Sequence, residues 1–112
     1  MIIYEHGDVV LIRFVFTNGS GAKRRPAVIV STSEYHQGRQ EAIVAFITSN
    51  VDRPLVGDHL ISGWQEAGLI FPSVATGIIR TIKQTMIERR LGTIPPADVQ
   101  AIQEQLRNVL GL

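Results

Sequence analysis

The sequence contains no cysteine. This absence excludes disulfide scaffolds and metal sites built on thiolates, and it suits a reducing compartment such as the cytoplasm. No apolar run approaches the roughly 20 residues that a membrane-spanning helix needs. The first residues include Glu5 and Asp8 and no apolar run, so we expect neither a signal peptide nor a membrane anchor.

The net charge is also small, because 11 basic residues nearly balance 10 acidic ones. Its distribution is more informative. Between residues 13 and 25 the chain carries no acidic residue and four basic ones, Arg13, Lys23, Arg24 and Arg25. A local cationic patch on a nearly neutral protein favours a small anionic target over a long duplex. The alternative is that these side chains only keep a loop in solvent.

The chain's 112 residues have the length of one domain, so we predict a single domain over residues 1–112. Apolar runs rich in β-branched residues predict strands at 9–16, 27–30 and 43–47, with weaker ones at 59–62, 73–75 and 78–82. Residues 86–91 fit either a strand or a helical turn. Both alternating faces of the first three runs are apolar, which predicts that a helix, the curled sheet or a second subunit covers each strand on both sides.

One amphipathic helix is predicted at residues 96–110. Its apolar residues Val99, Ile102 and Leu106 recur at helical spacing. The carboxylate of Asp98 favours the positive end of the helix dipole. We therefore expect a mainly β chain with a C-terminal helix, folded as a small, strongly bent antiparallel sheet or partly open barrel.

The stretch from Thr17 to Arg25 is predicted to be a loop, because its Asn-Gly and Ser-Gly pairs favour turns. Pro26 fixes its own φ and favours an extended backbone at Arg25. Arg25 is therefore expected where a flexible loop meets a rigid strand. The strand at 43–47 is followed by Thr48, a residue that β-branching alone would explain at a strand end.

Several catalytic arrangements find no support. The three histidines lack metal-ligand spacing, and the chain has neither a phosphate-binding glycine loop nor a serine-hydrolase elbow. No pair of carboxylates stands out for glycoside hydrolysis. We therefore expect no metal and no cofactor. Acid–base cleavage of RNA by His36 and His59 stays an open alternative, because spacing alone does not bring them together.

Cleavage of RNA without a metal requires few protein groups. The 2′-hydroxyl can attack the adjacent phosphorus, so the enzyme has to align the backbone, stabilise the charged intermediate and move two protons. An arginine fork can clamp two phosphate oxygens, and a nearby hydroxyl can donate a hydrogen bond to them. Arg25 and Thr48 offer this pair of groups.

With these residues in this order, the chain resembles the MazF/PemK family of bacterial toxin endoribonucleases over nearly all of its length. The segments that carry the resemblance are Gly7–Leu11, Gly19–Ser20, Arg25–Ser31, Ala42–Ser49, Pro72–Val74, Arg80–Ile82 and Leu91–Thr93. The Arg-Pro start of one strand, the Ile-Thr-Ser end of another and the Leu91–Thr93 segment before the terminal helix, taken in this order, are together specific to the family. The chain departs from the family at the short Gly21-Ala22-Lys23 segment and at Ile78.

The resemblance implies a small SH3-like antiparallel barrel of the MazF/CcdB type that acts as a homodimer. It implies sequence-specific, metal-independent cleavage of single-stranded mRNA, which leaves a 2′,3′-cyclic phosphate and a 5′-hydroxyl. By position, Arg25 and Thr48 would be catalytic. The expected RNA-binding residues are Ser20, Lys23, Arg24, Ser49 and Arg80. A cognate antitoxin would block the RNA groove with a flexible segment, in a heterotetramer or larger complex.

Two rival functions stay open at this point. Small barrels of this shape also serve as non-catalytic modules that bind nucleic acid or peptide, because a fold does not settle a function. A gyrase-targeting toxin of the CcdB type would share the fold and act on a protein.

Overall fold

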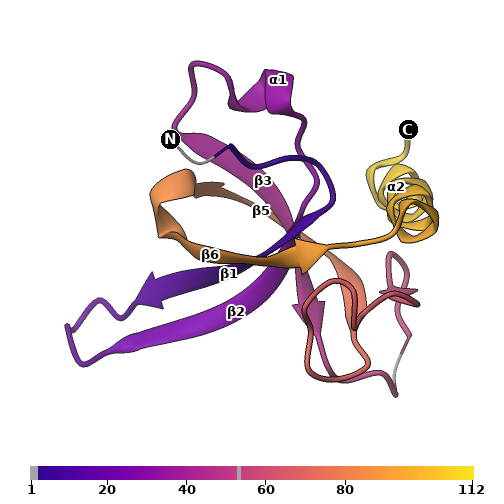
Figure 1. Cartoon of the computed structure of the whole chain (residues 1–112), viewed down its shortest axis with the longest axis horizontal. Coiled ribbons are helices and arrows are strands. Elements are labelled where there is room, and N and C mark those ends of the chain that lie inside the picture. Colours follow the sequence, from indigo (N-terminus) through magenta and orange to yellow (C-terminus); the bar gives the residue numbers. More distant parts are fainter. Residues whose placement is uncertain (1–2, 53) are drawn as a thin grey trace.

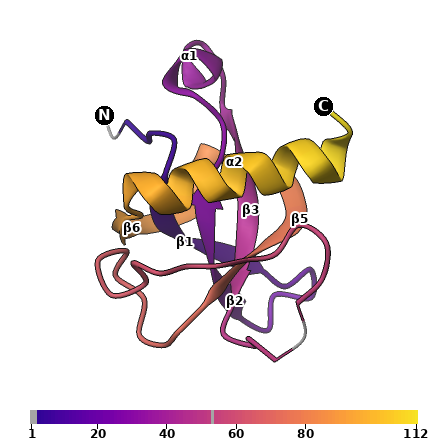
Figure 2. The ribbon, with the colours of Figure 1, turned by 90° about the vertical axis from the view of Figure 1, so that its right-hand side faces the viewer.

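A computed structural model describes residues 3–52 and 54–112. Its elements, in chain order, are β1 (Asp8–Val15), β2 (Ala22–Ile29), α1 (Ser33–His36), β3 (Glu41–Thr48), β4 (His59–Leu60), β5 (Val74–Lys83), the 3₁₀ turn η1 (Gln84–Met86), β6 (Ile87–Thr93) and α2 (Pro96–Leu110). The strands form one antiparallel sheet in the order β4-β5-β3-β2-β1-β6. This sheet curls into a half-barrel, and α2 lies across one face of it (Figures 1 and 2). The predicted mainly β architecture with a C-terminal helix is confirmed.

Both faces of the sheet are apolar and covered, as the sequence predicts. The face beneath α2 is buried in a core that includes Val9, Val28, Ala45 and Ile102. The opposite face has its own core, which includes Val10, Ala27, Val44 and Ile82. Neighbouring residues of one strand enter different cores because side chains alternate between the two faces of a sheet. The chain itself therefore supplies both covers.

The predicted boundary of the second strand is wrong. β2 begins several residues earlier, so Lys23, Arg24 and Arg25 lie in a strand rather than in a loop. They pair with residues 12–14 of β1, which gives the backbone of this polar stretch the hydrogen-bond partners that a loop would have sought in solvent. The turn between the two strands is correspondingly short, at residues 16–21.

The second half of the sheet also differs in detail from the prediction. Residues 74–83 form the single strand β5 where two strands were expected. An irregularity explains the apparent break, because the register with β3 shifts between Ala45 and Ile47. There the hydroxyl of Thr76 donates to the carbonyl of Phe46 at 2.8 Å. β4 is shorter than predicted. Of the ambiguous segment at 86–91, Met86 ends the 3₁₀ turn η1 and residues 87–91 belong to strand β6.

The sheet opens between β2 and β3 at Pro26. β2 pairs with β1 from Ala22 to Val28, whereas its ladder with β3 begins only at Ala27. Pro26 lacks an N–H, so it cannot donate a ladder hydrogen bond to β3. The proline therefore marks the point beyond which the two strands part.

Two glycines hold the segment before β4 against β5. Gly57 has a φ of +97°, and a Cβ at this position would lie 2.9 Å from the Cα of Gly77 and 2.6 Å from a methyl group of Val109. Only glycine combines this backbone conformation with so close an approach. The contact fixes the position of the next residue, Asp58, relative to β5.

We expect Gly57→Ala to lower the free energy of unfolding by about 2–4 kcal/mol, because it adds backbone strain to a steric clash. Chemical denaturation measures the loss. Gly38→Ala is the matched control: Gly38 has a φ of +70° and open space around its Cα, so it reports the backbone cost alone, about 1 kcal/mol. Equal losses in the two variants would contradict the proposed close packing.

Asp98 joins α2 to the segment that follows β4. Its side chain is 1% exposed. Oδ1 accepts hydrogen bonds from His59 Nε2 at 2.7 Å and from the N–H and hydroxyl of Ser62 at 3.0 and 2.8 Å, while Oδ2 accepts from the N–H of Gly63 at 2.9 Å. Burial alone would raise the pKa of this carboxyl. The hydrogen bonds from His59, Ser62 and Gly63 together outweigh burial and hold the pKa below its ordinary value.

In the part of the chain that the structure describes, neither α2 nor any other helix is long and apolar enough to cross a membrane.

Candidate functional site

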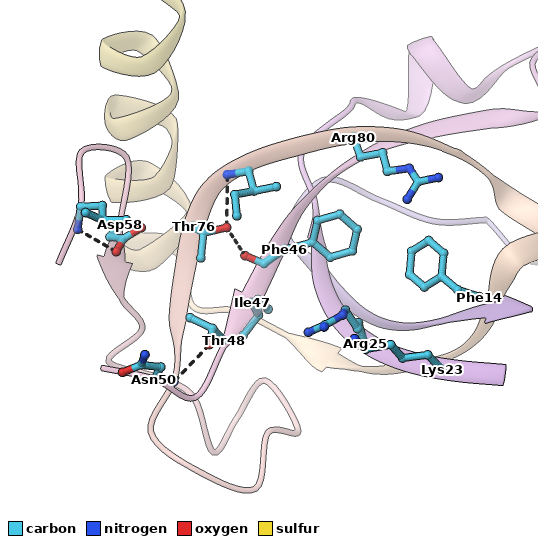
Figure 3. Close-up of a pocket in the computed structure, with 12 residues that line it drawn as sticks. Phe14, Lys23, Arg25, Phe46, Ile47, Thr48, Asn50, Asp58, Thr76 and Arg80 are labelled. Carbon is cyan, nitrogen blue, oxygen red and sulfur yellow. Dashed lines mark hydrogen bonds between the residues drawn. The ribbon is translucent and has the colours of Figure 1, made fainter. Parts of the chain in front are cut away.

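A hollow of about 620 Å³ lies where β2 and β3 part (Figure 3). Strands β1, β2, β3 and β5 supply most of its lining, which consists of Phe14, Lys23, Arg25, Phe46, Ile47, Thr48, Thr76, Ile78 and Arg80. The remainder comes from Asn50, Leu55 and Asp58, between β3 and β4. Most of these side chains therefore stand on a rigid sheet, which holds their relative positions more closely than loops would.

A second hollow, of about 460 Å³, shares Arg25, Ile47 and Thr48 with the first. Much of its remaining lining is apolar and comes from Leu11, Pro26, Leu69, Ile70, Phe71 and Leu91. Ser49 and Arg89 add polar groups. Arg25 and Thr48 therefore lie at the junction of the two hollows, and a chain-like ligand that occupied both would pass them.

Arg25 and Thr48 face each other across the gap in the sheet. The register that pairs Ala27 with Phe46, continued by two residues along each strand, places Arg25 across from Thr48. Figure 3 shows Arg25 extending from β2 on the side of the hollow that faces β3. Thr48 Oγ1 accepts the N–H of Asn50 at 3.1 Å, so the hydroxyl proton is left to donate to another group.

Aromatic rings and cations gather at the end of the first hollow nearer β1. The rings of Phe14 and Phe46 have centroids 6.0 Å apart, and the guanidinium of Arg80 lies 5.1 Å from the centroid of Phe14. Lys23 lies directly opposite Phe14 in the β1–β2 ladder. Such a surface can stack an unpaired base and attract its phosphate. Lys23 and Arg80 both line this hollow.

The two phenylalanines were missed by the sequence analysis. Both belong to apolar runs that are typical of core strands, and Phe14 and Phe46 are in fact packed partly against the core. Their position in the sequence could have indicated that they line a site, because each is near the end of its apolar run, where the strand passes to polar residues.

Ser20 and Arg24 line neither hollow. Ser20 lies in the exposed β1–β2 turn, where its N–H donates to Asn18 Oδ1 at 3.0 Å. Arg24 projects to the opposite face of β2 from its two basic neighbours, because side chains alternate along a strand. Its Nε donates to both carboxylate oxygens of Glu88, at 2.9 and 3.0 Å. These residues are separate from the cluster around Arg25.

The structure does not bring His36 and His59 together. His36 Nδ1 lies 2.9 Å from the carbonyl oxygen of Tyr4, and its Nε2 lies 2.6 Å from Ser31 Oγ. A carbonyl only accepts, so Nδ1 carries a proton, and in the neutral ring Nε2 accepts from the serine hydroxyl. His59 is bonded to Asp98. Both histidines join segments of the fold and line neither hollow.

Within residues 3–52 and 54–112, no group of three histidine, aspartate or glutamate side chains is arranged to hold a metal ion.

Comparison with known proteins identifies a family for this fold. The family model described as PemK-like, MazF-like toxin of type II toxin–antitoxin system matches residues 5–110. No curated protein sequence matches the chain.

Solved structures share the fold at low sequence identity. An endoribonuclease in complex with its cognate antitoxin, from a mycobacterial species, is 21% identical with a TM-score of 0.75, over 97% of this chain and 96% of that one. A chain of a MazE–MazF structure from Deinococcus radiodurans is 17% identical with a TM-score of 0.83, over 100% and 99%. The Mycobacterium tuberculosis toxin MazF-mt6 is 23% identical with a TM-score of 0.73, over 92% and 97%.

Proposed function

This chain belongs to the family of PemK-like, MazF-like toxins of type II toxin–antitoxin systems, and from that premise we propose that it is a sequence-specific endoribonuclease that cleaves single-stranded mRNA without a metal ion. The observation that carries the proposal is the position of Arg25 and Thr48 at the junction of two hollows. The endoribonucleases and MazF toxins among its structural relatives support it.

Arg25 would clamp the scissile phosphate. Two N–H groups of one guanidinium match two phosphate oxygens in a fork, and they oppose the charge that develops as phosphorus becomes five-coordinate. Thr48 would donate a further hydrogen bond to the same oxygens. The N–H of Asn50 already occupies one lone pair of its hydroxyl oxygen, which favours the hydroxyl as a donor toward the hollow.

The reaction needs no atom beyond those of the RNA. The 2′-oxygen forms a bond to phosphorus and loses its proton, while the bond from phosphorus to the 5′-oxygen breaks and that oxygen gains a proton. The products are a 2′,3′-cyclic phosphate and a 5′-hydroxyl. Proton transfer falls to Arg25 or to water in the open groove, and alignment of the attacking oxygen accounts for much of the acceleration.

The remaining cations would position the strand on either side of the cut. Lys23 and Arg80 would attract phosphates at the aromatic end of the first hollow, where Phe14 and Phe46 can stack bases. Ser49 would bind RNA in the second hollow. Ser20 and Arg24 would contact a longer strand only beyond these hollows.

A cognate antitoxin would inhibit the protein by laying a flexible segment through the same groove. Ile70 and Phe71, which are 82% and 62% exposed beside the second hollow, supply apolar surface for such a segment. The mycobacterial endoribonuclease is described in complex with its antitoxin. We further propose a homodimer, a heterotetramer or larger complex with the antitoxin, and action in the cytoplasm, where mRNA is available.

One assay separates this function from its rivals. Purified protein is incubated with a long single-stranded RNA plus a chelator, and separately with gyrase and plasmid DNA. We expect fragmented RNA and normal supercoiling. Intact RNA that binds with salt-dependent affinity would favour a non-catalytic module. Intact RNA with impaired supercoiling would favour a toxin of the CcdB type.

Thr48→Val is expected to slow cutting by roughly 10–100-fold, because it removes one neutral donor to the phosphorane and keeps the β-branched shape. Single-turnover rates at saturating enzyme measure the effect on the chemical step. Thr48→Ser restores the hydroxyl and should retain most of the rate. A wild-type rate in the valine variant would exclude the hydroxyl from the reaction.

A further inference from the structure

The first hollow carries opposite charges at its two ends (Figure 3). Lys23 and Arg80 lie at the aromatic end, Asp58 and Asn50 lie at the other end, and Arg25 is between the two ends. A nucleic-acid strand carries one negative charge per phosphate, so a carboxylate beside its path repels the backbone. The favourable partner of Asp58 in this groove is therefore a hydrogen-bond donor, and the donors of a nucleotide are mostly on its base.

Asp58 is held in place rather than free to turn away. Its Oδ2 accepts the N–H of Leu55 at 2.9 Å, and its own N–H donates to the carbonyl of Leu55 at 3.0 Å. The residue before it, Gly57, is packed closely against Gly77 of β5, which fixes the backbone at Asp58. From the described residues, Oδ1 accepts no hydrogen bond. Asp58 lines this end of the hollow, and its carboxylate thus has one oxygen left to accept a hydrogen bond.

Asn50 adds the complementary donor and connects it to the proposed phosphate site. Its N–H donates to Thr48 Oγ1 at 3.1 Å, and its Oδ1 accepts the N–H of Asp52 at 3.3 Å. The second bond orients the amide so that its NH₂ group is left to donate. This end of the hollow therefore presents one acceptor, on Asp58, and one donor, on Asn50.

We propose that this end of the hollow recognises the Watson–Crick edge of cytosine or adenine, on which an amino group adjoins a ring-nitrogen acceptor. Asp58 accepts from the exocyclic amino group, and the amide of Asn50 donates to the ring nitrogen. Uracil presents a carbonyl oxygen where cytosine has its amino group, so it would set oxygen against carboxylate. The inference rests on the proposed function, because it assigns the base beside the phosphate bound by Arg25.

Binding of short 2′-deoxy oligonucleotides tests the inference without cleavage, because they lack the attacking hydroxyl. Fluorescence anisotropy compares strands that contain only cytosine, only adenine or only uracil. We expect the wild-type protein to bind either the cytosine or the adenine strand about tenfold more tightly than the uracil strand. The stronger of the two identifies the base. In Asp58→Asn we expect this ratio to fall to within about twofold, because an amide can also donate to a uracil carbonyl.

Asp52→Asn is the matched control. It removes the same charge from the same connection at an exposed residue outside both hollows, so its ratio should equal that of the wild type. Equal binding of all strands by the wild type, or an unchanged ratio in Asp58→Asn, overturns the inference. RNA cutting is measured on the same preparations: a base preference without cutting contradicts the proposed function alone, and cutting without a preference contradicts the inference alone.

Discussion

Alanine in place of Arg25 is expected to slow RNA cutting by at least about 10²–10³-fold, because no other group in the hollow can clamp two phosphate oxygens from the same position. The fold should not change. The side chain of Arg25 is exposed, and it forms no ion pair with any residue in 3–52 or 54–112. Its loss should therefore change the free energy of unfolding by less than about 0.5 kcal/mol.

Single-turnover cutting of one RNA, together with thermal unfolding, separates the two effects. Arg39→Ala is the matched control, because it removes the same side chain from a position that lines neither hollow. The guanidinium of Arg39 lies instead 4.4 Å from the ring centroid of Tyr35. Arg25→Lys keeps the positive charge and loses the fork of two N–H groups. If this variant cuts at a rate between those of wild type and Arg25→Ala, the difference from wild type measures the contribution of bidentate geometry. A folded Arg25→Ala protein that cuts at the wild-type rate would remove this residue from the mechanism.

Asp98→Ala should produce the largest loss of stability, about 3–5 kcal/mol. The substitution deletes the acceptor of four hydrogen bonds and leaves donors of His59, Ser62 and Gly63 without it in a buried site. Chemical denaturation measures the change. Glu104→Gln, at an exposed position of the same helix, controls for the lost charge and should be nearly neutral.

The same carboxylate predicts a pH dependence. The pKa of Asp98 is lower in the folded protein than in the unfolded chain, where an aspartate titrates near about 3.9. A group of this kind contributes stability above its unfolded pKa and loses the contribution as pH falls through its folded pKa. Asp98→Asn keeps the shape of the side chain and one acceptor oxygen, but it removes the titrating carboxyl. We therefore expect this variant to lack the acid-sensitive part of the free energy of unfolding. Parallel stability curves for Asp98→Asn and wild type below about pH 4 would contradict it.

The architecture could be predicted because its signals are local. The apolar runs at 9–16 and 43–47 specify strands that are covered on both faces, and both cores are present. The helix at 96–110 is confirmed with both of its boundaries. The resemblance to the MazF/PemK family is confirmed by the match to residues 5–110.

The geometry of the site could not be predicted, because it depends on contacts between distant segments. Composition placed Lys23 and Arg25 in a loop, and pairing with β1 places them in a strand. Pro26 was interpreted as a stiff strand start, yet it also ends the ladder with β3 and so opens the hollow. Asp98 was assigned to the helix dipole alone, whereas its partners lie 35–39 residues away in the chain. The roles of Arg25 and Thr48 stay predictions.

The chemical identity of the cut ends tests the proposed attack by the ribose 2′-hydroxyl most directly. Mass spectrometry of fragments produced in the presence of a chelator should find 2′,3′-cyclic phosphates and 5′-hydroxyls. A single 2′-deoxy substitution at the cut site should abolish the break. Fragments with 5′-phosphates, or cutting that requires a divalent cation, would contradict catalysis by a guanidinium clamp at Arg25.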